Sequence, residues 1–197
     1  MYKNIVFDVG KVLFSYKWQE ALEKAGVPKK EAAELFPKLF DDYYWQELDL
    51  GKRPYFEIVK DFEEKYPQYK DELRRYFTDV ENLPVPRPMI WDEIKRLKEN
   101  GYRLYILSNY SEYMFSKHTE GVPFIECMDG ILVSYMVNLC KPDENIYKTL
   151  FERFDIKPEE SLFFDDRPEN TEMARSLSMD AITVTSEEYL LEQLRAL

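Results

Sequence analysis

The sequence has few of the residues that build metal sites and covalent cross-links. It contains one histidine, His118, and two cysteines, Cys127 and Cys140, which are not in CxxC spacing. A zinc site needs clustered cysteine and histidine ligands, and a disulfide framework needs several cysteines in pairs. The sequence therefore disfavours both kinds of site.

Long apolar segments are missing as well. No run approaches the ~18 apolar residues that span a bilayer. The N-terminal residues MYKNIVFDVG place an aspartate and a glycine where a signal peptide would have its apolar stretch. We therefore expect a cytoplasmic protein with no membrane partner.

Positive charge is scarce. The chain has 27 Lys and Arg against 38 Asp and Glu, which gives a net charge of -11. This charge repels polyanions at long range, so we expect no nucleic-acid partner. A small anionic substrate stays compatible with the sequence if a metal ion and a lysine reverse the field locally.

The composition is otherwise that of a folded protein, since 45% of the 197 residues are hydrophobic and 33% are charged. This length predicts one domain with a smaller insertion. The proline-rich LPVPRP at 83–88 cannot be helical and is expected to be the linker that closes the insertion. We predict a helical inserted domain over 16–85 and a core domain made of 1–15 and 86–197. The amphipathic, aromatic-rich segments that predict the inserted helices are WQEALEKAG, KKEAAELF, LFDDYYWQEL, YFEIVKDFEEKY and KDELRRYF.

Outside the insertion, strand and helix patterns alternate, which is typical of βαβ units and a parallel sheet. We predict an α/β, Rossmann-like fold with a five-stranded parallel sheet and helices on both faces. The predicted strands are NIVFDV, RLYILS, GILVSY, SLFFDD and AITVT. Two helices are predicted between them, MIWDEIKRLKEN, which ends at Gly101, and DENIYKTLFERF.

Four fragments with polar residues follow these strands, at the edge where open α/β sheets bind ligands. In FDVGKVLF, Asp8 leads into a glycine turn and is a candidate nucleophile or metal ligand, with a turn-capping aspartate as the alternative. In YILSNY, Ser108 and Asn109 offer a hydroxyl and backbone N–H groups to an oxyanion. An N-cap role explains Ser108 equally well.

The other two fragments carry charge. In LCKPDENIY, Lys141 would neutralise a phosphoryl oxygen and nearby carboxylates, unless it is simply a surface lysine. In LFFDDRPEN, Asp165 and Asp166 close an apolar strand, where unpaired charges are costly and a cation compensates them. Oxygen ligands alone favour Mg²⁺ over zinc or copper. A salt bridge to Lys141 would account for part of this charge.

In order and spacing, FDVGKVLF, YILSNY, CKPDENIY and FFDDRPEN resemble the four motifs of the haloacid dehalogenase-like hydrolase superfamily. The resemblance covers essentially the whole chain and is strongest with the magnesium-dependent phosphatases that carry a helical cap domain after the first motif. It implies that Asp8 is the catalytic nucleophile. It also implies that Ser108 and the amide of Asn109 hold the phosphoryl group, while Lys141 neutralises charge.

The same resemblance implies a Mg²⁺ site. Asp8 and Asp166 would bind the ion directly together with the carbonyl of Gly10, and Asp165 would support the site with Asn170. One departure concerns Gly10, because phosphatases of this superfamily usually carry an aspartate there as general acid and base. A positioned general acid contributes about 10²–10⁴ in rate. Members with a similar glycine resemble sugar-phosphate phosphatases.

We therefore expect a phosphatase that hydrolyses a small phosphorylated metabolite, a phosphate monoester such as a sugar phosphate, through an aspartyl-phosphate. Two alternatives stay open. A 2-haloacid dehalogenase of the same superfamily needs no metal, although Asp165 and Asp166 would then be uncompensated. A catalytically silent phosphate-binding regulatory protein is supported only by Gly10. Both a monomer and a homodimer are compatible with the sequence.

Substrate choice is expected to lie in the cap. Tyr43, Tyr44 and Trp45 are candidates for the wall of a pocket, and the GKRP turn is a candidate for presenting Lys52 or Arg53 to a polar substrate. The alternative for the aromatic residues is a role in the core of the cap.

Overall fold

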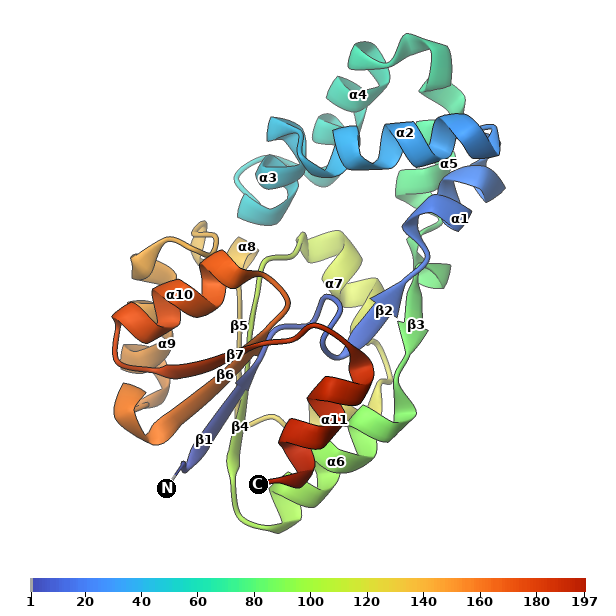
Figure 1. Ribbon diagram of the computed structural model, residues 1–197. Helices are drawn as coiled ribbons and strands as arrows, with labels where there is room; N and C mark the ends of the chain where they lie inside the picture. Colours follow the sequence, from blue (N-terminus) through green and yellow to red (C-terminus); the bar gives the residue numbers. More distant parts are fainter. Residues whose placement is uncertain (1) are drawn as a thin grey trace.

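The computed structural model describes residues 2–197, and its centre is a parallel sheet of five strands (Figure 1). Each strand pairs in parallel with its neighbours in the order β5-β4-β1-β6-β7. The predicted α/β fold and its five strands are confirmed. The strands are β1 (Asn4–Phe7), β4 (Arg103–Ser108), β5 (Gly130–Val133), β6 (Ser161–Asp165) and β7 (Asp180–Thr183).

Both faces of the sheet are buried, which explains the continuous apolar runs of its strands. Successive side chains of a strand point to opposite faces, so Ile5 and Phe7 of β1 lie in one hydrophobic cluster and Val6 lies in another. The helices α6 (Pro88–Glu99) and α11 (Glu187–Arg195) contribute to the first cluster. The second cluster contains residues of α9 (Glu144–Phe154) and α10 (Pro168–Ser176).

Several elements of the core depart from the sequence prediction. The predicted strand GILVSY ends at Val133, because Ser134 begins the short helix α8 (Ser134–Val137). The sequence prediction also missed α7 (Glu112–Thr119), α10 and α11.

A layer of five helices lies beyond the carboxyl ends of the strands (Figure 1). The segment LFDDYYWQEL was predicted as one helix, but the structure divides it at Asp41 and Asp42. Asp42 is the N-cap of the second helix, where its carboxylate accepts a hydrogen bond from the amide of Tyr44 at 3.1 Å. The five helices are α1 (Trp18–Ala25), α2 (Lys29–Phe40), α3 (Tyr43–Leu50), α4 (Tyr55–Lys65) and α5 (Lys70–Thr78).

Two short antiparallel strands join this helical layer to the rest of the chain. These are β2 (Phe14–Tyr16) and β3 (Pro84–Pro86), and they pair with Tyr16 opposite Pro84. Residues 84–86 of the proline-rich segment are not helical, as expected, and form a ladder that was not predicted. Pro88, which was predicted to be non-helical, is the first residue of α6, where its missing amide proton costs no hydrogen bond. We propose that this ribbon is the boundary of the inserted cap domain at residues 16–85.

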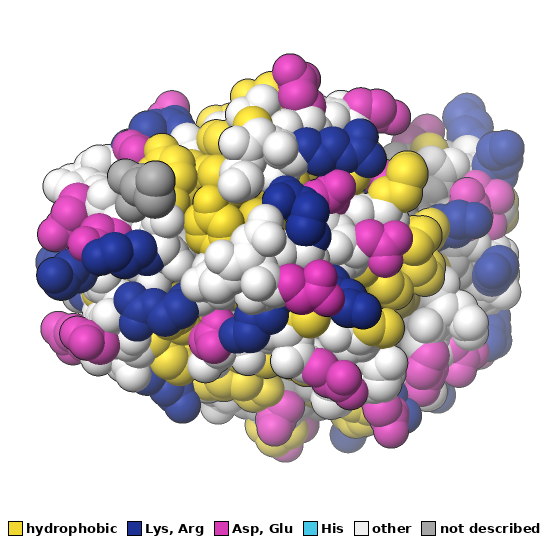
Figure 2. Space-filling model, turned by 90° about the horizontal axis from the view of Figure 1, so that it is seen from below, with side chains coloured by type: hydrophobic (Ala, Val, Ile, Leu, Met, Phe, Trp, Pro, Cys, Tyr) yellow, Lys and Arg dark blue, Asp and Glu magenta, His cyan; other side chains and the backbone are white. Residues whose placement is uncertain are grey.

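The end of the molecule opposite the cap, seen from below in Figure 2, carries acidic and basic side chains interspersed rather than gathered by sign. Within residues 2–197, every helix is too short or too polar to cross a lipid bilayer.

Candidate active site

The polar fragments of the sequence meet at the carboxyl ends of β1, β4 and β6, facing the cap (Figure 1). A cavity of about 620 Å³ opens between them and the cap helices. Of the residues predicted for the site, Ser108 and Asp165 lie beneath the cavity wall, fully buried, and bond to residues that line it. Those that line the cavity are Asp8, Gly10, Asn109, Lys141, Asp166 and Asn170.

Asp8 follows the last residue of β1, and its two carboxylate oxygens have different surroundings. Oδ1 accepts hydrogen bonds from the Ser108 hydroxyl at 2.7 Å and from the Lys141 ammonium at 2.8 Å. Within residues 2–197, no group donates to Oδ2, which faces Gly10. The carboxylate is thus fixed through one oxygen and available through the other.

Lys141 is a buried lysine, so the alternative of a surface lysine is wrong. Its side chain is 1% exposed, and its ammonium also donates to Asp165 at 2.6 Å and to the Leu107 carbonyl at 2.9 Å. Burial opposes the positive charge, but the carboxylates of Asp165 and Asp8 outweigh it and raise the pKa of Lys141. The lysine therefore stays charged between the two carboxylates.

Asp165 is fully buried, and donors surround both of its oxygens. Besides Lys141, the amide of Arg167 donates to Oδ1 at 2.8 Å and the side chain of Asn170 donates to both oxygens at 2.9 and 3.0 Å. The carboxylate therefore holds Lys141 and Asn170 in position. Asp165 ends β6, Arg167 precedes α10 and Asn170 lies in the first turn of α10, so the lysine is the one group that comes from another part of the chain.

Asp166 is the more accessible of the two acids, with an 18% exposed side chain, and it pairs with the Lys11 ammonium at 3.2 Å. Oxygens of Asp8, Asp165 and Asp166 lie within 4.8 Å of one another. Burial raises the pKa of Asp166, and burial likewise raises the pKa of Asp8 against the opposing effect of Lys141. This cluster of oxygen donors can hold a hard divalent cation.

The N-cap alternative for Ser108 is wrong. The N-cap of α7 is Ser111, whose hydroxyl accepts from the amide of Met114, whereas Ser108 donates to Asp8. Asn109 uses its side chain to join two loops, since it donates to the Lys141 carbonyl at 2.9 Å and accepts from the Lys141 amide at 2.8 Å. Its own amide as a phosphoryl donor stays a prediction.

Gly10 does not need to be glycine for backbone reasons, because its φ lies outside the left-handed region. A Cβ atom at this position would lie 3.6 Å from Asp8 Oδ2 and 3.8 Å from Tyr16 Cε2, both ordinary contacts. The position is therefore open to a side chain that points toward the free oxygen of Asp8.

Sequence reasoning missed a chain of hydrogen bonds beside this position. The hydroxyl of Tyr16 forms a hydrogen bond with the hydroxyl of Tyr110. The Tyr110 hydroxyl forms a second hydrogen bond with His118 Nδ1 at 2.6 Å, and His118 Nε2 forms a third with the Val80 carbonyl at 2.8 Å. Burial lowers the pKa of His118 to about 4, so the ring is neutral at pH 7. A carbonyl only accepts, so Nε2 carries the proton, Tyr110 donates to Nδ1 and Tyr16 donates to Tyr110. No local pattern in the sequence indicates this chain.

The cap contributes its own side chains to the cavity. Tyr43 and Trp45 line it, as expected, whereas Tyr44 packs against Phe62 in the cap. Arg53 was expected to face a substrate, but it forms ion pairs with Glu47 at 2.9 Å and Asp61 at 2.7 Å. Asp49 at the end of α3 also lines the cavity and was not predicted.

The chain is similar in sequence to several known proteins. The family model for haloacid dehalogenase-like hydrolases matches residues 2–177. The D-ribitol-5-phosphate phosphatase of Bacteroides thetaiotaomicron is 26% identical, covering 91% of this chain and 90% of the relative. The sesquiterpene phosphatase of Aspergillus oryzae is 22% identical, covering 100% and 96%. Acyl-CoA dehydrogenase family member 10 of Mus musculus is 24% identical over the whole chain, which spans only 19% of that relative.

Solved structures share the fold. A HAD family enzyme from Bacteroides thetaiotaomicron, in complex with magnesium and inorganic phosphate, superimposes with a TM-score of 0.77 at 21% identity, covering 95% of this chain and 96% of that chain. An L-2-haloacid dehalogenase from Xanthobacter autotrophicus with covalently bound chloropropionic acid gives 0.71 at 17% identity, covering 100% and 83%.

Proposed function

Since the chain belongs to the haloacid dehalogenase-like hydrolase family, we propose that it is a magnesium-dependent phosphatase of small phosphate monoesters, with Asp8 as its nucleophile. The observation that carries this proposal is the asymmetry of Asp8, whose Oδ1 is held by Ser108 and Lys141 while Oδ2 faces the cavity. Two relatives named as phosphatases support the choice of reaction.

In the proposed mechanism, Asp8 Oδ2 attacks the phosphorus atom in line with the ester oxygen, which leaves with the electron pair of its bond. The product is an aspartyl-phosphate on Asp8, which water then hydrolyses. Lys141 lies 2.8 Å from Asp8 Oδ1, where its charge stabilises the phosphoryl oxygens that gather negative charge. Asp165 holds Lys141 in place by accepting a hydrogen bond from its ammonium, and Asn170 in turn donates to Asp165.

The donor set fits a magnesium ion. Asp8 and Asp166 present carboxylates to the cavity beside the backbone of Gly10, and Asp165 completes the cluster from beneath. We propose Asp8, Asp166 and the Gly10 carbonyl as direct ligands, with Asp165 as a support. When bound, Mg²⁺ supplies positive charge to the phosphoryl oxygens and offsets the mutual repulsion of the three acids.

We propose a sugar or polyol phosphate as the substrate class. The cavity volume of about 620 Å³ suits a ligand of that size. Its walls combine aromatic surfaces, on which a sugar ring packs, with polar groups that bond to hydroxyls. The aromatic residues are Trp18, Phe40 and Trp45, and the polar ones include Gln46 and Asp49. The relative named D-ribitol-5-phosphate phosphatase supports this class.

The test is a panel of phosphorylated metabolites assayed for phosphate release with and without Mg²⁺, with Asp8→Asn as the inactive control. We expect Mg²⁺-dependent release with a preference for sugar and polyol phosphates. A preference for prenyl phosphates would replace the substrate class and leave the reaction standing. Halide release from 2-haloacids in chelator, without phosphate release in Mg²⁺, would overturn the phosphatase assignment.

A further inference from the structure

The proposed reaction lacks a proton donor two residues after the nucleophile, because residue 10 is glycine. The departing ester oxygen of an alkyl or sugar phosphate is a strong base and needs a proton as the bond breaks. The donor must line the same cavity as Asp8, and its proton must not be committed elsewhere. These two conditions can be checked for each side chain of the cavity.

Asp49 meets both conditions. It lies one residue before the end of α3 and lines the cavity together with Asp8 and Lys141. Within residues 2–197, no group donates a hydrogen bond to its carboxyl, and both oxygens therefore have free capacity. Burial, reinforced by the negative charge of Asp8 and opposed by Lys141 and Arg167, raises the pKa of Asp49 to about 7. A substantial fraction of the group is therefore protonated at neutral pH, and the pKa is suited to both giving and taking a proton.

Three contacts hold this end of α3 against the core helix α8. Ser134 Oγ donates to the Asp49 carbonyl at 2.5 Å, and Asn138 Nδ2 donates to the Leu50 carbonyl at 2.8 Å. Gly51 lies so close to Tyr135 that an added Cβ would be 2.7 Å from the Tyr135 Cβ. The position of Asp49 over the cavity is thus fixed by core–cap contacts at the residue itself and at the two residues that follow it.

Tyr16, whose ring would lie 3.8 Å from a Cβ atom at residue 10, fails the second condition. Its proton points toward Tyr110, because the Val80 carbonyl fixes the direction of the chain through His118 and Tyr110. Its hydroxyl oxygen can accept a hydrogen bond from the cavity but has no proton to give.

Several other side chains of the cavity are occupied or are weaker acids. Lys11 pairs with Asp166, Tyr43 donates to Glu47, and Asp42 both caps α3 and pairs with Lys65. Burial raises the pKa of the Cys140 thiol to about 12, which makes it a far weaker acid than Asp49.

We propose that Asp49 of the cap is the general acid and base of the proposed phosphatase, in place of the side chain that Gly10 lacks. This inference rests on the proposed function. As the P–O bond of the ester breaks, its electron pair goes to the ester oxygen, which takes the proton of the Asp49 carboxyl. The resulting carboxylate then takes a proton from the water that attacks the aspartyl-phosphate. The P–O bond to Asp8 breaks with its electron pair returning to Asp8, and Asp49 is protonated again.

The test is the rate of phosphoryl transfer in single turnover for phosphate monoesters whose leaving groups range from dinitrophenol to simple alcohols. We expect Asp49→Asn to slow alkyl phosphates by about 10²–10⁴ and activated aryl phosphates by less than about tenfold, because only the former need the proton. Asp71→Asn, at an exposed position of α5, is the matched control and is expected to leave all rates unchanged.

A second variant keeps the test decisive if Asp49→Asn alters the cap. Gly10→Asp in the Asp49→Asn background is expected to restore alkyl phosphate turnover at least tenfold, since a Cβ at residue 10 has room beside Asp8. Equal slowing of all esters by Asp49→Asn, or no slowing of alkyl phosphates, would overturn the role of Asp49. If the unaltered protein transfers no phosphoryl group from any ester in Mg²⁺, it is the proposed function that fails.

Discussion

Asp8 and Lys141 show how burial shapes the surroundings of a single carboxylate. The Asp8 side chain is 10% exposed, so its charge is disfavoured by desolvation and tolerated because Lys141 and Ser108 bond to one oxygen. The same two bonds fix the direction of the second oxygen. In the proposed mechanism, this costly charge is kept in the folded protein because it is the nucleophile.

The first prediction concerns Asp8→Asn. The substitution removes the nucleophile, so we expect turnover to fall by on the order of 10⁴-fold or more. Because it also removes a charge whose burial is unfavourable, while Lys141 keeps Asp165 as partner, we expect the free energy of unfolding to be unchanged or higher. Activity assays and urea unfolding measure the two effects. Turnover within tenfold of the parent protein would contradict the role of Asp8.

The second prediction concerns His118, which is 3% exposed. Burial lowers its pKa from 6.5 to about 4, against smaller effects of the Val80 carbonyl and Glu81. The unfolded chain therefore takes up a proton near pH 6.5 that the folded protein does not take up until about pH 4. The stability contributed by the neutral ring is complete above pH 6.5 and is lost as the pH falls toward 4. The shift corresponds to about 3 kcal/mol.

His118→Gln keeps a donor for Val80 and an acceptor for Tyr110 but does not titrate. Urea unfolding at pH 7 and pH 4 should therefore show that the parent protein loses up to about 3 kcal/mol more than the variant. Equal losses in the two proteins would mean that folding does not lower the pKa of His118.

At the scale of elements, the sequence predicted the strands more accurately than the helices and their boundaries. The apolar runs of β1, β4 and β6 were recognisable because both faces of the sheet are buried, and the polar residues at their ends placed Asp8, Ser108 and Asp166 at one edge. The helix α7 has a weaker pattern, with polar residues among its buried ones. The break at Asp42 depends on a cap whose acceptor also pairs with Lys65, a residue distant in the sequence.

The third prediction concerns the contact between α3 and α8. Gly51 and Gly121 both have positive φ, +63° and +70°, so alanine is strained at each position. Nothing lies within 4 Å of an added Cβ at Gly121, and we expect Gly121→Ala to cost about 1 kcal/mol. At Gly51 the backbone of Tyr135 lies 3.0 Å from the added atom and must move. We expect Gly51→Ala to cost more than Gly121→Ala in urea unfolding.

The two variants should also differ in function. Asp49 lies two residues before Gly51, so a shift of this end of α3 moves the proposed proton donor. We expect Gly51→Ala to slow alkyl phosphates more than activated aryl phosphates, and Gly121→Ala to change neither. Identical kinetics in the two variants would mean that the docking of α3 does not position the cavity.

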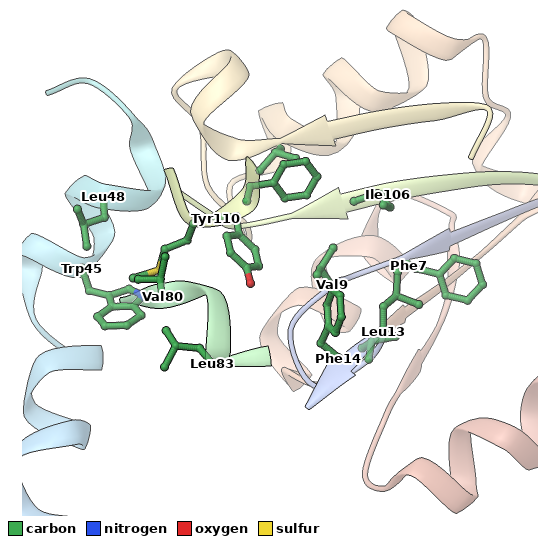
Figure 3. Packing of buried hydrophobic residues seen from close by; sticks show 14 of the residues in the cluster. Phe7, Val9, Leu13, Phe14, Trp45, Leu48, Val80, Leu83, Ile106 and Tyr110 are labelled. Carbon is green, nitrogen blue, oxygen red and sulfur yellow. The ribbon is translucent and has the colours of Figure 1, made fainter. Parts of the chain in front are cut away.

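At the scale of the whole molecule, the cap and the core share one hydrophobic cluster (Figure 3). Trp45 and Leu48 of α3 belong to the same cluster as Phe7 and Ile106 of the sheet, and Tyr110 lies between these groups. The different periodicities of the sequence predicted a helical segment and a segment of alternating strands and helices. Nothing in the sequence indicated that they share a core, because that depends on which faces of separate helices meet.

The prediction of the site from the sequence was limited in the same way. Residues next to strand ends were predictable because the parallel sheet brings all carboxyl ends of its strands to one edge. Asp49 and the chain from Tyr16 to His118 were not predictable, since they depend on how the cap lies over the core. Side chains contributed by the second domain are thus the part of this site that only the structure reveals.

The fourth prediction concerns removal of the cap. Tyr16 and Pro84 face each other in the β2–β3 ladder, so deleting residues 17–83 and joining the two with Asn-Gly makes a hairpin. The five-stranded sheet contains no cap residue, and we expect the shortened protein to fold. It should be less stable by several kcal/mol, because His118 loses the Val80 carbonyl and Tyr110 loses apolar neighbours.

Circular dichroism and urea unfolding of the shortened protein test the domain boundary, and single-turnover rates test which phosphate esters need the cap for phosphoryl transfer. With Asp8, Lys141 and Asp166 retained, activated aryl phosphates should still phosphorylate Asp8, whereas alkyl phosphates should lag by about 10²–10⁴ because Asp49 is gone. Gly10→Asp in the shortened protein is expected to reduce that lag. A shortened protein that stays unfolded would place the domain boundary elsewhere. One that folds and turns over alkyl and aryl phosphates with unchanged preference would show that the cap supplies neither specificity nor the proton.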